Sequence, residues 1–204
     1  MTTRERMIDE QIRARDVRDA RVLDALARVP RELFVPDASK PEAYADHPVP
    51  IGHGQTISQP YIVAYMTAAL RLAPSHRVLE VGTGCGYQTA VLAELAREVF
   101  SVEVIPALAE DARARLDRIG YRNVHITVGD GHRGWSEHAP YDRVLVAAAA
   151  EAVPPALVEQ LADTGILVIP VGASNQELRV LQKHGTRVDL LGTLPVRFVP
   201  LVRP

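Results

Sequence analysis

A glycine-rich turn between a predicted strand and a predicted helix constrains the fold of this chain more than any other feature. The run from Val78 to Val81 is apolar except for Glu80 and predicts a buried strand, and glycines follow it at alternate positions, Gly82, Gly84 and Gly86. Apolar residues at helical spacing come next, namely Val91, Leu92 and Leu95. Glycine permits a tight turn and lets a ligand approach the backbone closely. Strand, glycine turn and helix in this order predict the first unit of a doubly wound α/β domain.

The spacing of these glycines distinguishes the turn from two phosphate-binding loops. A dinucleotide-binding turn reads G-x-G-x-x-G and a P-loop ends in Gly-Lys-Ser/Thr, whereas this turn has neither pattern and contains no lysine. It resembles motif I of the class I S-adenosylmethionine (AdoMet) methyltransferases. The resemblance implies that the acid before the turn and the turn itself hold the methionine end of AdoMet, through Glu80, Gly82, Thr83, Gly84, Cys85 and Gly86. On the turn alone, a structural turn of any α/β protein stays open as the alternative.

Two acidic residues follow at the ends of later predicted strands. Val99–Glu103 predicts the second strand, and Glu103 lies where carboxylates of open α/β sheets meet ribose hydroxyls. A carboxylate suits a diol because it can accept two hydrogen bonds. A third strand, Val124–Val128, leads into Asp130 and Gly131, the place where methyltransferases contact the adenine. A solvated charge at a strand end and a plain Asp-Gly turn are the respective alternatives.

The wider pattern predicts a single α/β domain with a Rossmann-like, doubly wound, mostly parallel sheet. Strands alternate with helices through residues 77–175, which would form the AdoMet-binding core. Residues 176–204 would add antiparallel strands that close the substrate site, with alternating apolar residues in 178–181, 188–191 and 195–201.

The first 76 residues would form a substrate-binding extension of helices and loops. Residues 4–29 predict one or two helices with Asp19 as an N-cap, and Pro60 predicts the start of a helix that runs to about Leu70. The segment 30–60 between them is rich in proline, glycine and polar residues. We expect it to be a long irregular binding loop.

Composition excludes several classes of function. The chain has 204 residues, a formal net charge of −2 and a pI near 6.4, so we expect no nucleic-acid partner. Its one cysteine, Cys85, cannot form an internal disulfide and fits a reducing, cytoplasmic compartment. The seven histidines show no paired metal spacing. We therefore expect no metal, and the absence of a long apolar run predicts no signal peptide and no membrane span.

The segment from Gly52 to Pro60 is the feature that addresses the methyl acceptor. Its sequence, Gly-His-Gly-Gln-Thr-Ile-Ser-Gln-Pro, places two glycines, two hydroxyls and amides within nine residues. Such a set can present several hydrogen-bond donors to a small anion. The alternative is that Thr56, Ser58 or Gln59 only caps the helix that begins at Pro60.

Taken together, the motifs resemble those of the protein-L-isoaspartate (D-aspartate) O-methyltransferase family. The matching segments cover nearly the whole chain in the family's order: 29–35, 52–60, 78–89, 129–131, 139–142, 167–172 and 196–201. The resemblance implies an enzyme of protein repair. It would transfer a methyl group from AdoMet, leaving S-adenosylhomocysteine (AdoHcy), to the free α-carboxylate of L-isoaspartyl residues or the side-chain carboxylate of D-aspartyl residues. The ester would then form a succinimide, whose hydrolysis returns some normal aspartate.

The same resemblance assigns residues to the substrate site and implies a monomer. Ser58 would be the active-site residue, and the neighbours that shape the carboxylate site would be Thr56, Ile57 and Gln59. The tail would close over the peptide through Val196, Arg197 and Phe198. Ala147 departs from the family pattern, which favours threonine or glycine there, and lies close enough to the predicted cofactor pocket to alter it.

Three other functions stay open from the sequence. Some relatives methylate one designated aspartate in a peptide natural product, although these often carry a long additional C-terminal domain. A small-molecule methyltransferase would leave the Gly52–Pro60 segment without a purpose. A protein that binds AdoMet as a sensor ligand without catalysis would not need the intact Ser58 segment.

Overall fold

The centre of the molecule is a mostly parallel β-sheet, as predicted. The computed structural model describes residues 3–204. Within these residues a seven-stranded sheet has the order β5-β4-β3-β6-β7-β8-β9. In that order the strands are Val124–Val128, Glu98–Glu103, Arg77–Val81, Tyr141–Val146, Leu161–Val171, Gln176–His184 and Arg187–Val196.

One strand of the sheet, β8, runs opposite to the other six. All pairs from β5 to β7 are parallel, and β7–β8 and β8–β9 are antiparallel. The central β3 and β6 are buried over most of their length, which explains why Val and Leu predominate in them. The prediction of a third antiparallel strand at 195–201 was wrong, because β9 is one long strand that ends at Val196. Beyond it, the chain makes only an isolated bridge from Pro200 to Ala149 among the described residues.

The predicted helices of the core are present. They are α3, α4, α5 and α6, spanning Pro60–Ala69, Tyr87–Ala93, Pro106–Arg118 and Pro155–Glu159. Proline occupies the first turn of α3, α5 and α6, where its missing N–H costs no hydrogen bond. The backbone of Gly120 follows α5 with a φ of +95°, a conformation that favours glycine after a helix end.

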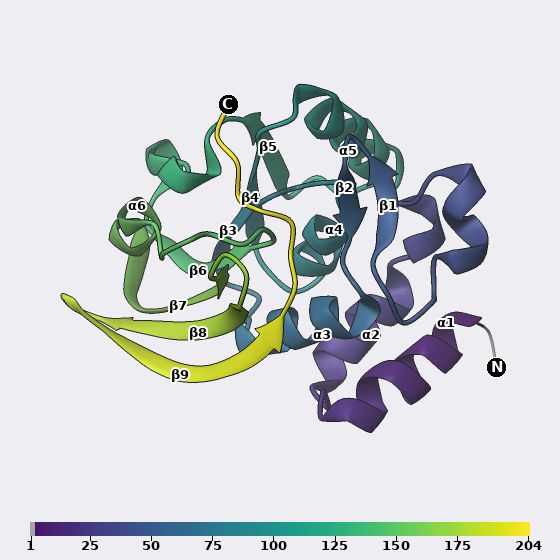
Figure 1. Ribbon diagram of the computed structural model, residues 1–204, viewed down its shortest axis with the longest axis horizontal. Coiled ribbons are helices and arrows are strands. Elements are labelled where there is room, and N and C mark those ends of the chain that lie inside the picture. The colour runs from purple at the N-terminus through teal and green to yellow at the C-terminus, as the bar shows by residue number, and fades with distance from the viewer. Residues whose placement is uncertain (1–2) are drawn as a thin grey trace.

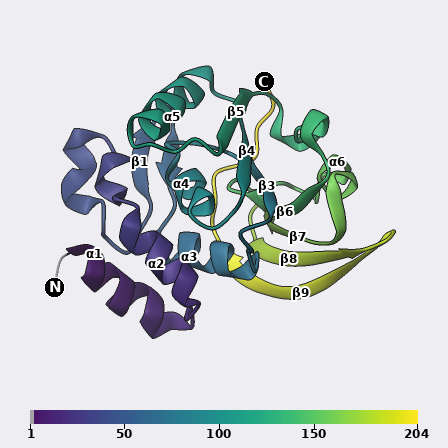
Figure 2. The same cartoon turned by 180° about the vertical axis from the view of Figure 1, so that it is seen from behind.

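The N-terminal extension packs on the same core through apolar faces of its helices. It contains α1 (Thr3–Arg6), a π-helical turn at Met7–Ile12 and α2 (Ala20–Arg28). The predicted cap is confirmed, because the Asp19 side chain accepts a hydrogen bond from the Arg21 amide. Figures 1 and 2 show these helices on the side of the molecule opposite the projecting β8–β9 hairpin.

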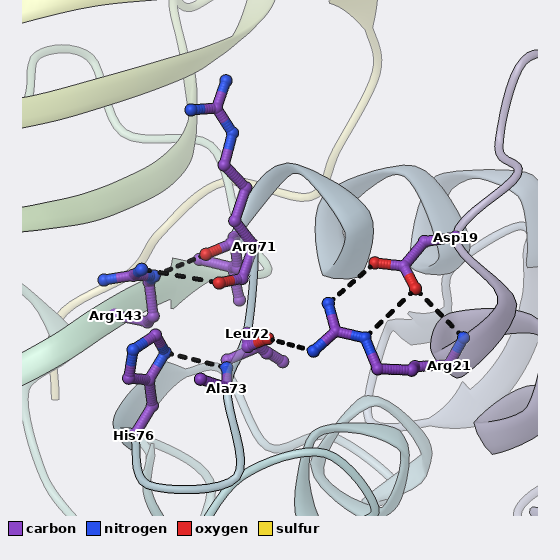
Figure 3. A network of polar contacts seen from close by, with 8 residues as sticks. Asp19, Arg21, Arg71, Leu72, Ala73, His76 and Arg143 are labelled. Carbon is purple, nitrogen blue, oxygen red and sulfur yellow. Dashed lines mark hydrogen bonds and ion pairs between the residues drawn. The ribbon is translucent and has the colours of Figure 1, made fainter.

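Two arginine side chains, one from the extension and one from the sheet, donate hydrogen bonds to backbone carbonyls of residues 70–72. Arg21 binds the Asp19 carboxylate and also donates to the Leu72 carbonyl at 2.8 Å, as Figure 3 shows. Arg143, on β6, donates from the other side to the carbonyls of Leu70 and Arg71. The connection between α3 and β3 is therefore held from both the extension and the sheet.

The segment 30–60 is more ordered than the sequence predicted. It contains short 3-10 turns and a two-stranded hairpin of β1 (Val49–Gly52) and β2 (Gln55–Ile57). Strands this short between prolines and glycines lack a recognisable period-two pattern, which is why an irregular loop was predicted. Strand β2 of this hairpin leads directly into Ser58.

Candidate functional site

A cavity opens at the carboxyl ends of the central strands. The turn after β3, the end of β4, the segment after β5 and the C-terminal tail provide its walls, through Gly82, Thr83, Gly84, Glu103, Gly131 and Leu201. Figure 1 shows the tail running from the end of β9 across these strands toward β5. Ligands of open α/β sheets bind at this edge, so the cavity lies where the sequence predicted the cofactor.

The glycine turn forms one wall and owes its shape to positive φ angles. The φ angles of Gly82, Gly84 and Gly86 are +93°, +53° and +89°. The first two line the cavity, but Gly86 does not; a Cβ there would lie 3.2 Å from Leu116 Cδ1 of α5. Gly86 therefore does not face the cavity, and its predicted contact with the cofactor stays a prediction. The absence of a side chain at Gly86 allows Leu116 of α5 to pack closely against the turn.

Glu103 joins the turn to the end of β4. Its Oε2 accepts a hydrogen bond from the Gly84 amide at 2.8 Å, and its Oε1 accepts one from the Ile105 amide at 3.0 Å. The residue is only 5% exposed and lines the cavity. A carboxylate can accept about four hydrogen bonds, so acceptor capacity remains for the hydroxyls of a bound ligand.

Glu80 lies behind the glycine turn and does not line the cavity. Its Oε2 accepts hydrogen bonds from the hydroxyls of Thr89 and Ser101, at 2.5 and 2.6 Å, while its Oε1 is buried without a partner. Burial raises its pKa to about 7, against the opposing effect of these two hydroxyl donors. The predicted direct contact of Glu80 with the cofactor thus stays a prediction, and the observed contacts position the turn.

Asp130 and Gly131, which follow β5, line different hollows of the surface. Gly131 lines the cavity, and a Cβ at this position would lie 2.4 Å from Val81 Cγ1. The Asp130 carboxylate lines a neighbouring groove and accepts hydrogen bonds from the His132 amide and ring. Burial opposes ionisation, but these contacts hold the pKa of Asp130 below its usual value. The expected contact of Asp130 with adenine stays a prediction.

A second cavity adjoins the first and contains most of the predicted substrate residues. Its walls include Thr56, Ser58, Gln59, Val196, Arg197 and Phe198. Thr56, Ser58, Ala147 and Val199 line both cavities. Ser58 therefore lies at the junction between the predicted cofactor and substrate sites, whereas Ile57 is buried and lines the first cavity only.

The contacts of Gln59 argue against the simple capping alternative. Gln59 is the residue before α3, yet its side chain makes no capping hydrogen bond in the part of the chain that the structure describes. Its amide nitrogen instead donates to the Asp46 carbonyl and carboxylate, at 3.1 and 2.8 Å. This contact fixes the Ser58 segment to the N-terminal extension.

The tail is a wall of both cavities, and this part of the site was only partly predicted. Beyond Phe198, it lines the first cavity with Val199, Pro200, Leu201 and Val202. The Ala149 amide donates to the Val199 carbonyl at 2.8 Å, and the Ala149 carbonyl accepts from the Leu201 amide at 2.7 Å. The family resemblance implied that the tail closes over the peptide, but it did not imply contact with the first cavity.

Residues 3–204 contain no group of three or more His, Cys, Asp or Glu that could hold a metal ion. No helix in the same range combines the length and apolarity needed to cross a bilayer.

Comparison with known proteins identifies the family. The model of the family described as protein-L-isoaspartate(D-aspartate) O-methyltransferase matches residues 2–204. A protein-L-isoaspartate O-methyltransferase of Picosynechococcus is 59% identical over 97% of this chain and 89% of its own. One from Opitutus terrae is 54% identical over 98% of this chain and 87% of its own.

Solved structures agree with the sequence relatives. A protein-L-isoaspartate O-methyltransferase has a TM-score of 0.88 and 28% identity over 97% of this chain and 65% of its own. A Plasmodium falciparum structure described as the same kind of enzyme, in complex with AdoHcy, has a TM-score of 0.83 and 25% identity over the whole of both chains. The chain belongs to the protein-L-isoaspartate (D-aspartate) O-methyltransferase family.

Proposed function

We propose that this enzyme methylates the free α-carboxylate of L-isoaspartyl residues, and the side-chain carboxylate of D-aspartyl residues, in damaged proteins and peptides. The family and its relatives support AdoMet-dependent carboxyl methylation. One observation supports the assignment of residues: the two cavities meet at Thr56, Ser58, Ala147 and Val199. This junction is where a methyl donor in one cavity and a carboxylate in the other would come into line.

The first cavity suits AdoMet, which supplies an electrophilic methyl group when bound. Glu103 offers carboxylate oxygens for the ribose hydroxyls, and the glycines at 82 and 84 allow close approach of the methionine end. Thr83 and Cys85 complete this wall, and Gly131 allows the chain after β5 to pack closely against Val81 of β3. We further propose that Glu80 and Gly86 act by supporting the turn and that Asp130 marks the adenine end.

The second cavity suits a peptide carboxylate. A carboxylate is already ionised at neutral pH, so the reaction needs no strong general base. It needs the oxygen held in line with the methyl group and water kept out. We assign the orientation of the acceptor oxygen to Ser58, with Thr56 and Gln59 shaping this wall, Ile57 supporting it from the side of the first cavity, and Val196, Arg197 and Phe198 covering the peptide.

The wider organisation follows from this assignment. Residues 1–76 would contribute the acceptor wall, 77–175 the cofactor core and 176–204 the cover of the peptide. We propose that the enzyme acts as a monomer in the cytoplasm, on proteins and peptides and not on nucleic acid or membranes.

The first test of this function compares two peptides that differ in one residue, L-isoaspartate or L-aspartate. With radiolabelled AdoMet, we expect base-labile methyl ester on the isoaspartyl peptide alone, measured as released methanol. Label on neither peptide, with AdoHcy binding intact, would overturn general repair and favour a dedicated acceptor.

The second test removes the Ser58 hydroxyl. Ser58→Ala should lower kcat because the acceptor oxygen loses a partner in the transition state, while AdoHcy affinity stays nearly unchanged. Ser75→Ala, at an exposed position between α3 and β3, is the matched control and should change neither quantity. A large loss of AdoHcy binding in Ser58→Ala would contradict the assigned role.

A further inference from the structure

A buried arginine lies directly behind the acceptor wall. Arg31 is 0% exposed and is among the largest fully buried side chains in the described part of the molecule. It comes from the short 3-10 turn at Arg31–Leu33, far from the methyltransferase core in sequence. Burial of a guanidinium is costly unless it is paired and hydrogen-bonded, so a sequence that retains one at this place requires an explanation.

The hydrogen bonds of Arg31 point to Ser58. Its Nη2 donates to the Ser58 carbonyl at 2.8 Å, and its Nε donates to the Ala43 carbonyl. The guanidinium carbon lies 4.9 Å from the ring centroid of Tyr87, which lines the first cavity. Arg31 thus connects the extension, the acceptor segment and the cofactor wall through one rigid, planar group.

The charge of Arg31 is not neutralised locally. Among residues 3–204, no carboxylate forms an ion pair with it, and its Nη1 is buried without a hydrogen-bond partner. Burial lowers the pKa of the guanidinium, but arginine starts so high that it stays protonated near neutral pH. A buried positive charge therefore lies one hydrogen bond away from the residue that would face an anionic acceptor.

We propose that Arg31 is a positioning residue for methyl transfer. It fixes the Ser58 backbone at the junction of the two cavities, and its uncompensated charge favours an acceptor that arrives as a carboxylate. This inference rests on the proposed function, and it assigns to Arg31 no contact with the substrate.

Two substitutions separate geometry from charge. Arg31→Lys keeps a positive charge, but one ammonium cannot reproduce the planar fork that reaches both Ala43 and Ser58. Arg31→Met keeps a long, flexible side chain and removes both the charge and the donors. Misplacement of a reacting group by about 1 Å costs as much as about 100-fold in rate, so we expect kcat/KM for the isoaspartyl peptide to fall by about that factor in Arg31→Met and by less in Arg31→Lys.

A control variant should lose stability but keep the hydrogen bond from Arg31 to the Ser58 carbonyl. Leu26→Ala creates a cavity at a fully buried position of α2, in the same apolar cluster as Tyr87 but outside both cavities. Assayed well below its melting temperature, it should keep the kcat/KM of the unaltered enzyme. AdoHcy affinity should stay within about twofold in all three variants, because none removes a group assigned to the cofactor.

The readouts distinguish this inference from the proposed function. Activity of the unaltered enzyme on the isoaspartyl peptide tests the function by itself. With that activity present, the order Leu26→Ala, Arg31→Lys, Arg31→Met in decreasing kcat/KM, at constant AdoHcy affinity, supports the positioning role. An Arg31→Lys variant with full kcat/KM, or a kinetic loss that tracks melting temperature across the three variants, would overturn it.

Discussion

Glu80 provides the most quantitative test of the physical description of the site. Its carboxyl is fully buried behind the glycine turn and accepts two hydroxyl hydrogen bonds at one oxygen. Glu80→Gln preserves the shape and leaves one oxygen to accept both hydroxyls, while removing the ionisable group. The substitution therefore isolates the cost of a buried negative charge.

The sign and size of the effect follow from the pKa. The ordinary pKa of 4.5 rises to about 7 in the folded protein, mainly because burial disfavours the charged form. Between these values the folded state holds a proton that the unfolded state has lost, so stability falls as pH rises. Each pKa unit corresponds to about 1.4 kcal/mol, which gives a total loss of about 3 kcal/mol that is complete above pH 7.

Urea unfolding of the ligand-free protein at pH 5, 6, 7 and 8 measures this cost. The stability of Glu80→Gln relative to the unaltered protein should increase with pH by most of the expected 3 kcal/mol or so and level off near pH 8. Glu110→Gln, which removes an exposed carboxylate from α5, is the matched control and should follow the unaltered protein. A Glu80→Gln curve parallel to that of the unaltered protein would refute the reasoning.

Three further predictions test the walls of the cavities. Gly131→Ala would place a Cβ 2.4 Å from a β3 methyl group and should cost about 1–3 kcal/mol of stability and weaken AdoHcy binding in calorimetry; unchanged affinity would contradict this. Gly86 and Gly120 share a φ near +90°, but only a Cβ at Gly86 would meet close neighbours. In urea unfolding, Gly86→Ala should therefore lose about 1 kcal/mol more stability than Gly120→Ala. Equal losses in the two variants would contradict this packing argument. Gln176→Leu removes a side chain that donates to the Phe198 carbonyl and accepts from its amide, so the peptide KM should rise by about tenfold, more than the AdoHcy Kd; an equal change in both would argue against a specific hold on the tail.

The core of the fold could be predicted because its patterns are long and locally consistent. β3 is mostly apolar, the glycines after it allow a tight turn, and α5 begins with proline and is followed by glycine. Such signals depend on neighbouring residues alone. The β1–β2 hairpin was not predicted because its strands are too short for periodicity to be visible, and 195–201 was misassigned because apolar spacing does not reveal which partner strand is present.

The sequence predicted which residues lie at the candidate site better than it predicted where their side chains point. The strand ends placed Glu103, Gly131 and the glycine turn at one edge of the sheet, since the carboxyl ends of parallel strands meet there. The same reasoning could not show that Glu80 points behind the turn or that the Asp130 carboxylate turns toward His132. The direction of Glu80 depends on Thr89 and Ser101, which come from other elements, and that of Asp130 depends on how the turn at Gly131–Arg133 folds.

The two walls of the proposed acceptor cavity are held mainly by hydrogen bonds to backbone groups. Arg31 holds the acceptor segment through the Ser58 carbonyl, and Gln176 holds the tail through the amide and carbonyl of Phe198. Both supports act on backbone groups, so they do not depend on which side chains face the peptide. Side chains such as exposed Arg197 can therefore change without loss of the wall itself. A repair enzyme must accept damage in many sequence contexts, and a cavity fixed by its backbone is a physical means of recognising a carboxylate while placing few demands on the residues around it.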